Sequence, residues 1–281
     1  IQREVSDLRQ QIRAEQNPDE AAKLRQQVQS QLNQLSTEAQ QRHIWRALYS
    51  PHQLQEQMTW FWMNHFNVST RKGDVRLWVG DYEEQAIRPH ALGNFRDLLT
   101  ASMRHPAMQL YLDNASNAAG HINENYAREL LELHTMGVGS GYTQADVQAM
   151  AHVLTGVGFT TRDADAPPPR LRPERQGDYL RQGFFEFNPN RHDYAPQIFL
   201  GKPLQKTGYA QVNEALDRIA RLLKDDRDAN FQEQNASGQT VNRWLSTGML
   251  AASASSNEAG YITHKVARSW GLLALDNQAR V

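Results

Sequence analysis

Ionisable side chains are concentrated in the segment 123–138, NENYARELLELHTMGV. Glu129 and Glu132 are three residues apart, which in a helix places the two carboxylates about 60° apart around the axis, close enough for acid–base chemistry or a shared metal ion. Arg128 would then orient a substrate or a second carboxylate. A structural explanation competes with this one, because Glu124, Arg128 and Glu132 at four-residue spacing form the salt-bridge ladder of an ordinary exposed helix.

Two histidines, His65 and His134, occupy helical faces that are otherwise apolar. A buried, hydrogen-bonded histidine is the commoner explanation of such a position. Because imidazole and carboxylate are typical metal ligands, His65, His134 and Glu129 are also candidates for holding a divalent metal, although no HExxH motif accompanies them. The expected cofactor is therefore unknown, with a divalent metal as the one candidate.

His192-Asp193 follows the aromatic run FFEF and an Asn-Pro-Asn turn, and is expected in a loop. Loops held by a rigid scaffold often carry functional residues, although an adjacent His-Asp pair also occurs by chance. No nucleophile elbow, phosphate-binding loop or dinucleotide fingerprint is present. The candidate catalytic residues are Glu124, Arg128, Glu129, Glu132, His65, His192 and Asp193.

The composition excludes several classes of function. Thirty basic against thirty-one acidic residues leave a net charge of −1, so nucleic acid is not an expected partner. The chain has no cysteine, which excludes disulfides and thiolate chemistry. No run of eighteen apolar residues occurs and the first residues do not resemble a signal peptide, so neither a membrane span nor a leader is predicted.

The N-terminal region 1–48 predicts a helical hairpin. Apolar residues recur at helical spacing from Ile1 to Ile12 and, after the break at Asn17-Pro18, from Leu24 to Leu35. Such narrow stripes suit either a hairpin laid on the body of the protein or a coiled-coil surface for a protein partner.

Further helices are expected along the rest of the chain. Ser50 and Pro51 have the chemistry of a helix start, and the aromatic run 60–66 should be buried or partly line a pocket, where Asn64 would need buried partners. Thr143 should cap a helix that follows a glycine-rich turn, with Asp146 completing the cap. The other expected helices cover 89–103, 106–111, 122–133, 212–223, 241–250 and 262–275.

Non-helical structure is expected mainly in 161–210. Four prolines make 164–175 an exposed loop, and the FFEF and IFLG runs suggest a small β-hairpin or flap. Residues 225–239 are polar and are expected to form a loop. The sequence thus predicts a mainly α protein: a compact helical domain, 50–281, with a small β flap and an N-terminal helical hairpin, 1–48.

Five segments resemble the bacterial domain-of-unknown-function family numbered 1800: FWMNHFNVS, IRPHALGNFRDLL, RHPAMQLYLDN, NENYARELLELHTMGV and GYTQADVQAMAHVLTG. The resemblance covers about 54–208, and the N-terminal helices also resemble those of family members. It departs from the family pattern at 113–121, which is shortened, and at 194–197. Beyond Arg221 no match to the family's usual ending is found, so 221–281 is unassigned.

The resemblance implies an exported bacterial protein, periplasmic or secreted, without an established activity. With the candidate residues above, the leading hypothesis is a hydrolase acting on an envelope or extracellular polymer, with a polysaccharide as a possible partner. The alternative is a non-enzymatic scaffold or assembly subunit that docks a protein partner through residues 1–48. A carbohydrate-binding module is a third hypothesis, which would require exposed Trp or Tyr on a flat face.

Overall fold

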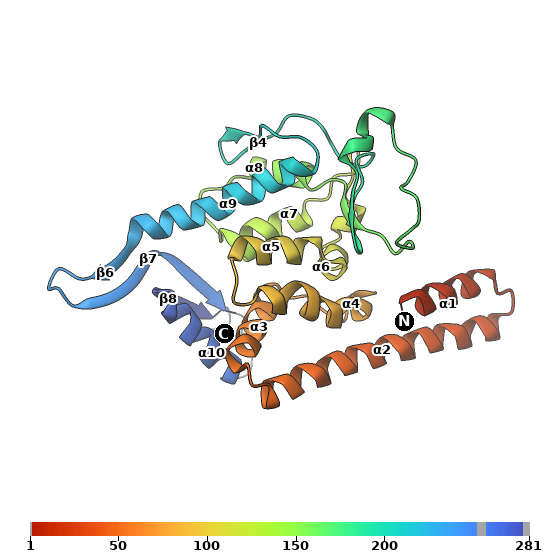
Figure 1. The fold of residues 1–281 in the computed structure, drawn as a ribbon, viewed down its shortest axis with the longest axis horizontal. Helices are drawn as coiled ribbons and strands as arrows, with labels where there is room; N and C mark the ends of the chain where they lie inside the picture. Colours follow the sequence, from red (N-terminus) through yellow and green to blue (C-terminus); the bar gives the residue numbers. More distant parts are fainter. Residues whose placement is uncertain (1, 252–256, 278–281) are drawn as a thin grey trace.

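The computed structural model describes residues 2–251 and 257–277. The protein is mainly α-helical (Figure 1). The elements of the N-terminal half are α1 (Gln2–Ala14), α2 (Pro18–Tyr49), α3 (Gln53–His65), α4 (Val75–Asp81), the π-helix η1 (Tyr82–Ile87), the 3-10 turn η2 (Arg88–His90), α5 (Phe95–Arg104), α6 (Pro106–Tyr111) and the 3-10 turn η3 (Asn114–Ser116). The C-terminal half contains α7 (Asn125–Glu129), the π-helix η4 (Leu130–Thr135), α8 (Gln144–Val153), β1 (Val157–Phe159), the 3-10 turn η5 (Pro173–Asp178), β2 (Leu180–Gln182), β3 (Phe185–Phe187), β4 (Ile198–Phe199), β5 (Lys202–Pro203), α9 (Tyr209–Asn230), β6 (Phe231–Gln234), β7 (Thr240–Ala251), α10 (Asn257–Ser269) and β8 (Leu272–Asn277).

The first two helices form the expected hairpin, and the hairpin lies on the body of the protein. Asn17 caps α2 through the N–H of Asp19, and Pro18 fits the first helical position, where no N–H is needed. The apolar stripes of α1 and α2 meet each other and Leu77 of α4. Figure 1 shows α2 running along the lower edge of the molecule beneath α4.

The main core lies between α3, α4, η1 and α5–α9. Its largest fully buried side chains include Trp78, Tyr82 and Tyr126. The Tyr82 hydroxyl donates to the carbonyl of Phe66 at 2.9 Å and also contacts Ser102, so this ring ties three helical elements together.

Three short antiparallel strands form a sheet in the order β1-β3-β2, and β4 pairs with β5. Strands β2 to β5 are the small β elements expected in 161–210, whereas β1 precedes that range. The ring of Phe184, in the turn between β2 and β3, packs edge-on against Trp78 with centroids 4.8 Å apart. The flap is thereby fixed on the helical core.

The last third of the chain differs from the sequence prediction. Residues 241–250, expected to be a helix, are strand in β7, and 262–275, also expected to be helical, divide between α10 and β8. The expected loop 225–239 begins as the last turns of α9 and continues as β6. Strands β6 and β7 are antiparallel, whereas β7 and β8 are parallel and are joined through α10. We call β6, β7, α10 and β8 the C-terminal unit.

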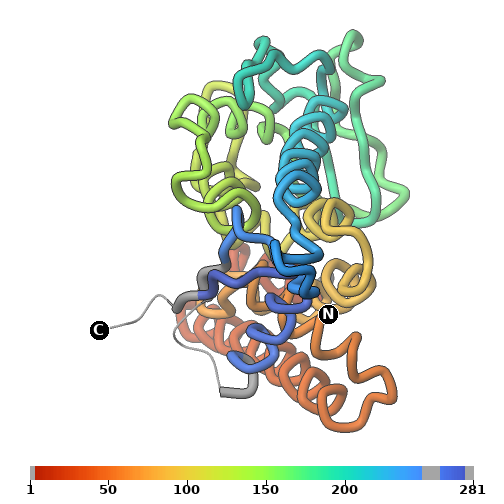
Figure 2. The backbone as a smooth tube through the Cα atoms, turned by 90° about the vertical axis from the view of Figure 1, so that its left-hand side faces the viewer, coloured from red at the N-terminus to blue at the C-terminus, as the bar shows by residue number. Residues whose placement is uncertain are grey.

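The C-terminal unit packs against α3 (Figures 1 and 2). The indole of Trp270 lies 5.4 Å from the ring of Phe61 and 5.5 Å from that of Trp62, between ring centroids. At the other side of the unit, Asp226 of α9 accepts hydrogen bonds from the Trp244 indole N–H and the Ser246 hydroxyl. Helix α9 therefore leads out of the core and anchors this unit.

Two local expectations around α3 are wrong. Ser50 ends α2 rather than starting α3, because its hydroxyl donates to the Glu56 carboxylate while α3 begins at Gln53 without a side-chain cap. Asn64 is exposed and donates to the Trp60 carbonyl of its own helix. Burial is confined to one side of α3, so Asn64 is not part of a polar pocket.

Candidate functional site

The acidic helix is built from α7 and η4, whose buried residues face the core and leave the acids outside. Arg128 donates to Glu124 at 3.1 Å and to the Gln144 side chain at 2.8 Å, while Gln144 donates to Glu124 at 2.7 Å. Glu124 and Arg128 are therefore satisfied by each other and by α8. Partial burial, and secondarily the nearby Glu132 carboxylate, raise the pKa of Glu129.

His65 and His134 meet within the apolar core. Nε2 of His65 lies 2.9 Å from the His134 carbonyl oxygen, and the two rings pack among Phe66, Phe95 and Tyr126. Burial lowers the pKa of both imidazoles, and that of His134 to about 3. Both rings are therefore neutral at ordinary pH. His65 is a buried, hydrogen-bonded histidine, whereas Nδ1 of His134 is buried with no hydrogen-bond partner among the described residues.

Asp193 meets His152 of α8, a residue outside the predicted set of catalytic candidates. Nδ1 of His152 lies 2.6 Å from Oδ2 of Asp193, and the Asp193 N–H donates to the Thr155 hydroxyl at 2.8 Å. Burial acts to raise the pKa of Asp193, but the N–H of Ala195 and the His152 ring outweigh it and lower the pKa. His152 and Asp193 are 41 residues apart, and only the fold brings them together.

His192 itself is buried, with 2% of its surface exposed. Its Nδ1 lies 2.8 Å from the Thr155 carbonyl oxygen, and burial lowers the pKa of the ring. The accessible pair is thus His152 and Asp193, whose side chains are 34% and 23% exposed. Such a pair can orient an imidazole for proton transfer.

A chain of buried amides holds these elements together, and it too was not foreseen. The Asn117 amide donates to the Ala151 carbonyl in the last turn of α8 at 2.9 Å and accepts from the Asn123 N–H at 2.9 Å. Asn114 donates to Gln109 and to the Val157 carbonyl. The loop between α6 and α7 is thereby attached to α8 and β1.

The candidate residues form three separate groups. Hydrogen bonds or ring contacts join Glu124 to Arg128, His65 to His134, and Asp193 to His152, and no hydrogen bond or ion pair between described residues joins one group to another. The convergence on one hollow that the hydrolase hypothesis requires is therefore not observed. The catalytic and metal-binding roles of the individual residues stay predictions.

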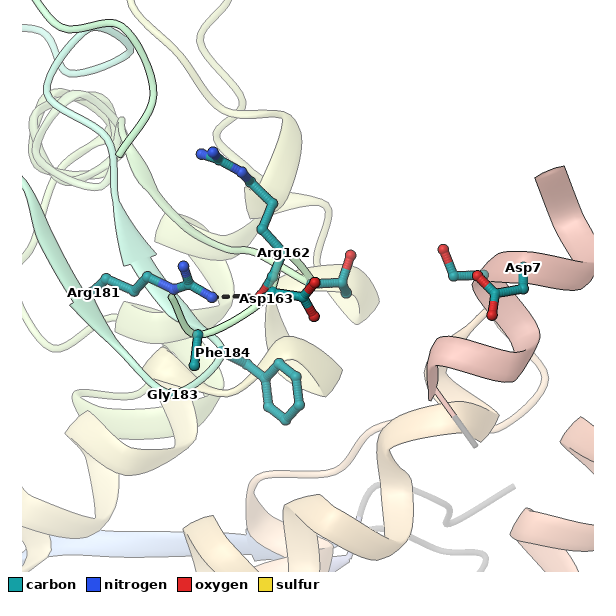
Figure 3. Close-up of a pocket in the computed structure, with 9 residues that line it drawn as sticks. Asp7, Arg162, Asp163, Arg181, Gly183 and Phe184 are labelled. Atoms are coloured by element: carbon teal, nitrogen blue, oxygen red, sulfur yellow. Dashed lines mark hydrogen bonds between the residues drawn. The ribbon is translucent and has the colours of Figure 1, made fainter. Parts of the chain in front are cut away.

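A cavity of about 490 Å³ lies elsewhere, between α1 and the flap. Figure 3 shows Asp7 of α1 on one side and Arg162, Asp163 and Phe184 on the other. None of the candidate catalytic residues lines it. Within 2–251 and 257–277, no group of three or more His, Asp or Glu side chains is arranged to hold a metal ion.

A different feature stands out at the corner where α2 passes into α3. Five large apolar side chains are exposed there within eleven residues of sequence, and we call them the docking face: Ile44, Trp45, Leu48, Tyr49 and Leu54. Their exposed fractions range from 56% to 69%. The rings of Trp45 and Tyr49 stack with centroids 5.0 Å apart.

Comparison with known proteins gives a family and a set of partial relatives. The chain matches the family described as protein of unknown function (DUF1800) over residues 2–224, which confirms the resemblance seen in the sequence. It is 72% identical over 68 residues to the formate dehydrogenase-O major subunit of Escherichia coli, covering 24% of this chain and 7% of that protein. Over 137 residues it is 32% identical to formate dehydrogenase 2 subunit alpha (cytochrome c-553) of Nitratidesulfovibrio vulgaris, covering 48% of this chain and 13% of that protein.

The chain thus corresponds to only a small part of these relatives. No solved structure matches it. Among the helices of the described residues, none has the length and hydropathy needed to cross a bilayer.

Proposed function

This chain belongs to the DUF1800 family of proteins of unknown function, and from its geometry we propose that it is a non-enzymatic docking subunit that binds a partner protein through the docking face. The observation that carries the proposal is the exposure of five large apolar side chains at one corner of the molecule. Four of them lie along one side of α2, and exposed apolar residues that cluster in this way mark interaction sites, whereas single ones are ordinary.

The energy available at this face is substantial. Full burial of a large apolar side chain is worth roughly 1.5–3 kcal/mol. Because each of these side chains has more than half of its surface exposed, a partner would gain roughly 1–2 kcal/mol from each. Aromatic anchors such as Trp45 and Tyr49 are the residue types that dominate binding energy in protein interfaces.

The spacing of the apolar residues on this face indicates the kind of partner. Ile44, Trp45, Leu48 and Tyr49 lie at i, i+1, i+4 and i+5, which makes a ridge along one side of α2 that fits a groove on another helix. The basic residues beside this ridge already have acidic partners on η1, because Arg42 and Arg46 pair with Glu84 and His43 pairs with Glu83. A partner helix with an apolar stripe would complement this ridge.

The state of the candidate catalytic residues is consistent with a docking role. Glu124 and Arg128 are satisfied by neighbours, and His65 and His134 are neutral core residues. The formate dehydrogenase match covers 7% of that subunit, which is too little to suggest formate oxidation for this chain.

The proposal is tested with a photo-crosslinking amino acid placed at Tyr49 in the full chain and expressed in the source cells. One protein should be captured in an amount proportional to the amount of the crosslinker-bearing chain. It is identified by mass spectrometry and then purified. The purified partner should bind the unmodified chain and lose at least tenfold in affinity for the double variant Trp45→Ser, Leu48→Ser, since about 1.4 kcal/mol corresponds to tenfold.

The control position is Gln26, an exposed polar residue on the same helix. Crosslinking at Gln26 should capture nothing. Equal capture at both positions, or equal affinity of the double variant, would overturn the docking role. Capture of a second copy of this chain would contradict binding to a different protein, and light scattering would then show the dimer.

A second function rests on the His152–Asp193 pair, whose imidazole is oriented by a carboxylate and partly open to solvent. It would serve as a general base in a hydrolase acting on an extracellular polysaccharide. Screening envelope polysaccharides with the wild-type chain and with Asp193→Asn tests this. Hydrolysis that Asp193→Asn lowers at least a hundredfold would support it, and absence of hydrolysis in the wild-type chain would exclude it for those substrates.

A further inference from the structure

Helix α2 is attached to the body in two different ways along its length. Its first part is held by apolar burial, with Val28 and Leu32 almost fully buried and Ala39 as the last buried apolar residue. At Ala39 the two helices pack closely, because a Cβ added to Gly80 of α4 would lie 3.1 Å from the Ala39 Cβ and 2.9 Å from Nη2 of Arg42. Beyond this point the attachment to the body is made by charged groups.

The charged attachment joins the end of α2 to η1. Nδ1 of His43 lies 3.0 Å from the Glu83 carboxylate, and both Arg42 and Arg46 pair with Glu84. Glu83 has only 4% of its surface exposed, and His43 is the one partner of its carboxylate among the described hydrogen bonds and ion pairs. The ring of His43 also packs edge-on against Trp60 of α3, with centroids 5.8 Å apart.

We propose that the proton on His43 is a switch that holds the end of α2, and with it the docking face, in a fixed orientation on the body. A buried carboxylate needs a counter-charge, and breaking such a pair by removing one charge is costly because the other charge is left buried. When His43 is neutral, Glu83 regains solvation only if the end of α2 moves away. The docking face begins at Ile44, so it moves with this segment.

The direction of the pH dependence follows from the groups around His43. The hydrogen bond to Glu83 raises the pKa of His43, burial opposes this, and the charges of Glu83 and Glu56 add to the increase. The charged groups around the ring come from four elements: Arg42 and Arg46 of α2, Glu56 of α3, Glu83 and Glu84 of η1, and Arg88 of η2. The His43–Glu83 part of the attachment is complete below the ordinary His43 pKa of 6.5 and is lost as the pH rises through the raised value. The end of α2 is then held only by the pairs of Arg42 and Arg46 with Glu84.

For the proposed function this means that docking is strongest at mildly acidic pH. A face held in one orientation binds better than a mobile one, because less conformational freedom is lost on binding. Only this pH dependence of docking rests on the proposed function; the His43 switch itself does not. The movement of α2 can be measured without a partner.

Because the chain has no cysteine, spin labels attach only at cysteines introduced by substitution. Spin labels on Gln41→Cys and Gln85→Cys, both at exposed positions, report the distance between the end of α2 and η1. In the otherwise wild-type chain a single narrow distance at about pH 6 should broaden and lengthen by about pH 9. A second pair, Gln26→Cys and Arg71→Cys, reports the apolar part of α2 and should stay narrow throughout.

Two variants separate the switch from general unfolding. His43→Gln removes the titrating group, and Glu83→Gln removes the buried charge, so each should abolish the pH dependence of the 41–85 distance. An unchanged distance between about pH 6 and about pH 9 in the wild-type chain would overturn the inference. So would a pH-dependent distance that persists in His43→Gln, or one that the 26–71 pair shows equally.

Discussion

Replacing Asn117 by Ala should destabilise the protein more than its single amide suggests. The side chain makes three hydrogen bonds: it donates to the Ala151 carbonyl and to Oδ1 of Asn114, and it accepts from the Asn123 N–H. Asn117 is completely buried and Asn114 is 1% exposed. Ala151 lies in the last turn of α8, where carbonyls lack the partner that a continuing helix would supply.

The expected size follows from the groups left behind. Each buried polar group that loses its partner costs about 1–3 kcal/mol. Two such groups, the Ala151 carbonyl and the Asn114 amide oxygen, are left unsatisfied in the buried interior, and the Asn123 N–H is half-buried and costs less. The free energy of unfolding should therefore fall by about 3–5 kcal/mol.

Urea denaturation followed by circular dichroism measures this difference. The matched control is Asn64→Ala, because Asn64 is exposed and its amide bonds only within its own helix. The control should change the free energy of unfolding by no more than about 0.5 kcal/mol. A loss below about 1 kcal/mol for Asn117→Ala would mean that water replaces the amide, and the conclusion that the buried amides attach the α6–α7 loop to α8 would be wrong.

Three further outcomes are expected. Burial lowers the pKa of His134 to about 3 from an ordinary 6.5, so the free energy of unfolding should fall as the pH drops below 6.5, by about 2–3 kcal/mol at pH 4.5. His134→Phe should remove that part of the loss in urea denaturation compared between about pH 6.5 and about pH 4.5. An equal loss in the variant would contradict a neutral buried ring. Gly80→Ala should cost about 1–3 kcal/mol in thermal denaturation, since its Cβ would meet Ala39, and an unchanged melting temperature would show that α2 can shift. Trp45→Ser with Leu48→Ser should leave the melting temperature within a few degrees, because both side chains are mostly exposed, whereas a large drop would place them in the core.

Much of the helical part of the fold could be predicted because its signals are local. Thr143 and Asp146 form the expected capping box, with the Thr143 N–H donating to Asp146 at 2.8 Å. Pro106 begins α6 as its missing N–H predicts. These residues interact with neighbours a few positions away, so their spacing alone identifies them.

The C-terminal unit could not be assigned in this way. The segment 241–250 mixes apolar and polar residues in a spacing that suits a helix or a strand, and only its pairing with β6 and β8 decides between them. The turn at 235–238, where Gly238 has a φ of 77°, is the local sign of a hairpin that the polar composition obscured.

The candidate site was predictable only in its parts. Each histidine was correctly placed on a helix or loop, but the partner of each depends on tertiary packing. His152 and Asp193 come from α8 and from the loop after β3, and His43 meets Glu83 forty residues later. The docking face was missed because exposure of Trp45 and Tyr49 depends on what covers them and not on their own spacing.

The continuity of α9 across the end of the family match has a mechanical consequence. The family match stops at Lys224, whereas the helix continues to Asn230 and holds the following strands through Asp226. A helix turns by roughly 100° for every residue, so the length of α9 sets the angle at which everything after it is presented. One residue inserted near Lys224 would swing the C-terminal unit by about that angle and withdraw Trp270 from Phe61 and Trp62. Only insertions of residues that add close to whole helical turns would keep the C-terminal unit at its present angle to the helical core.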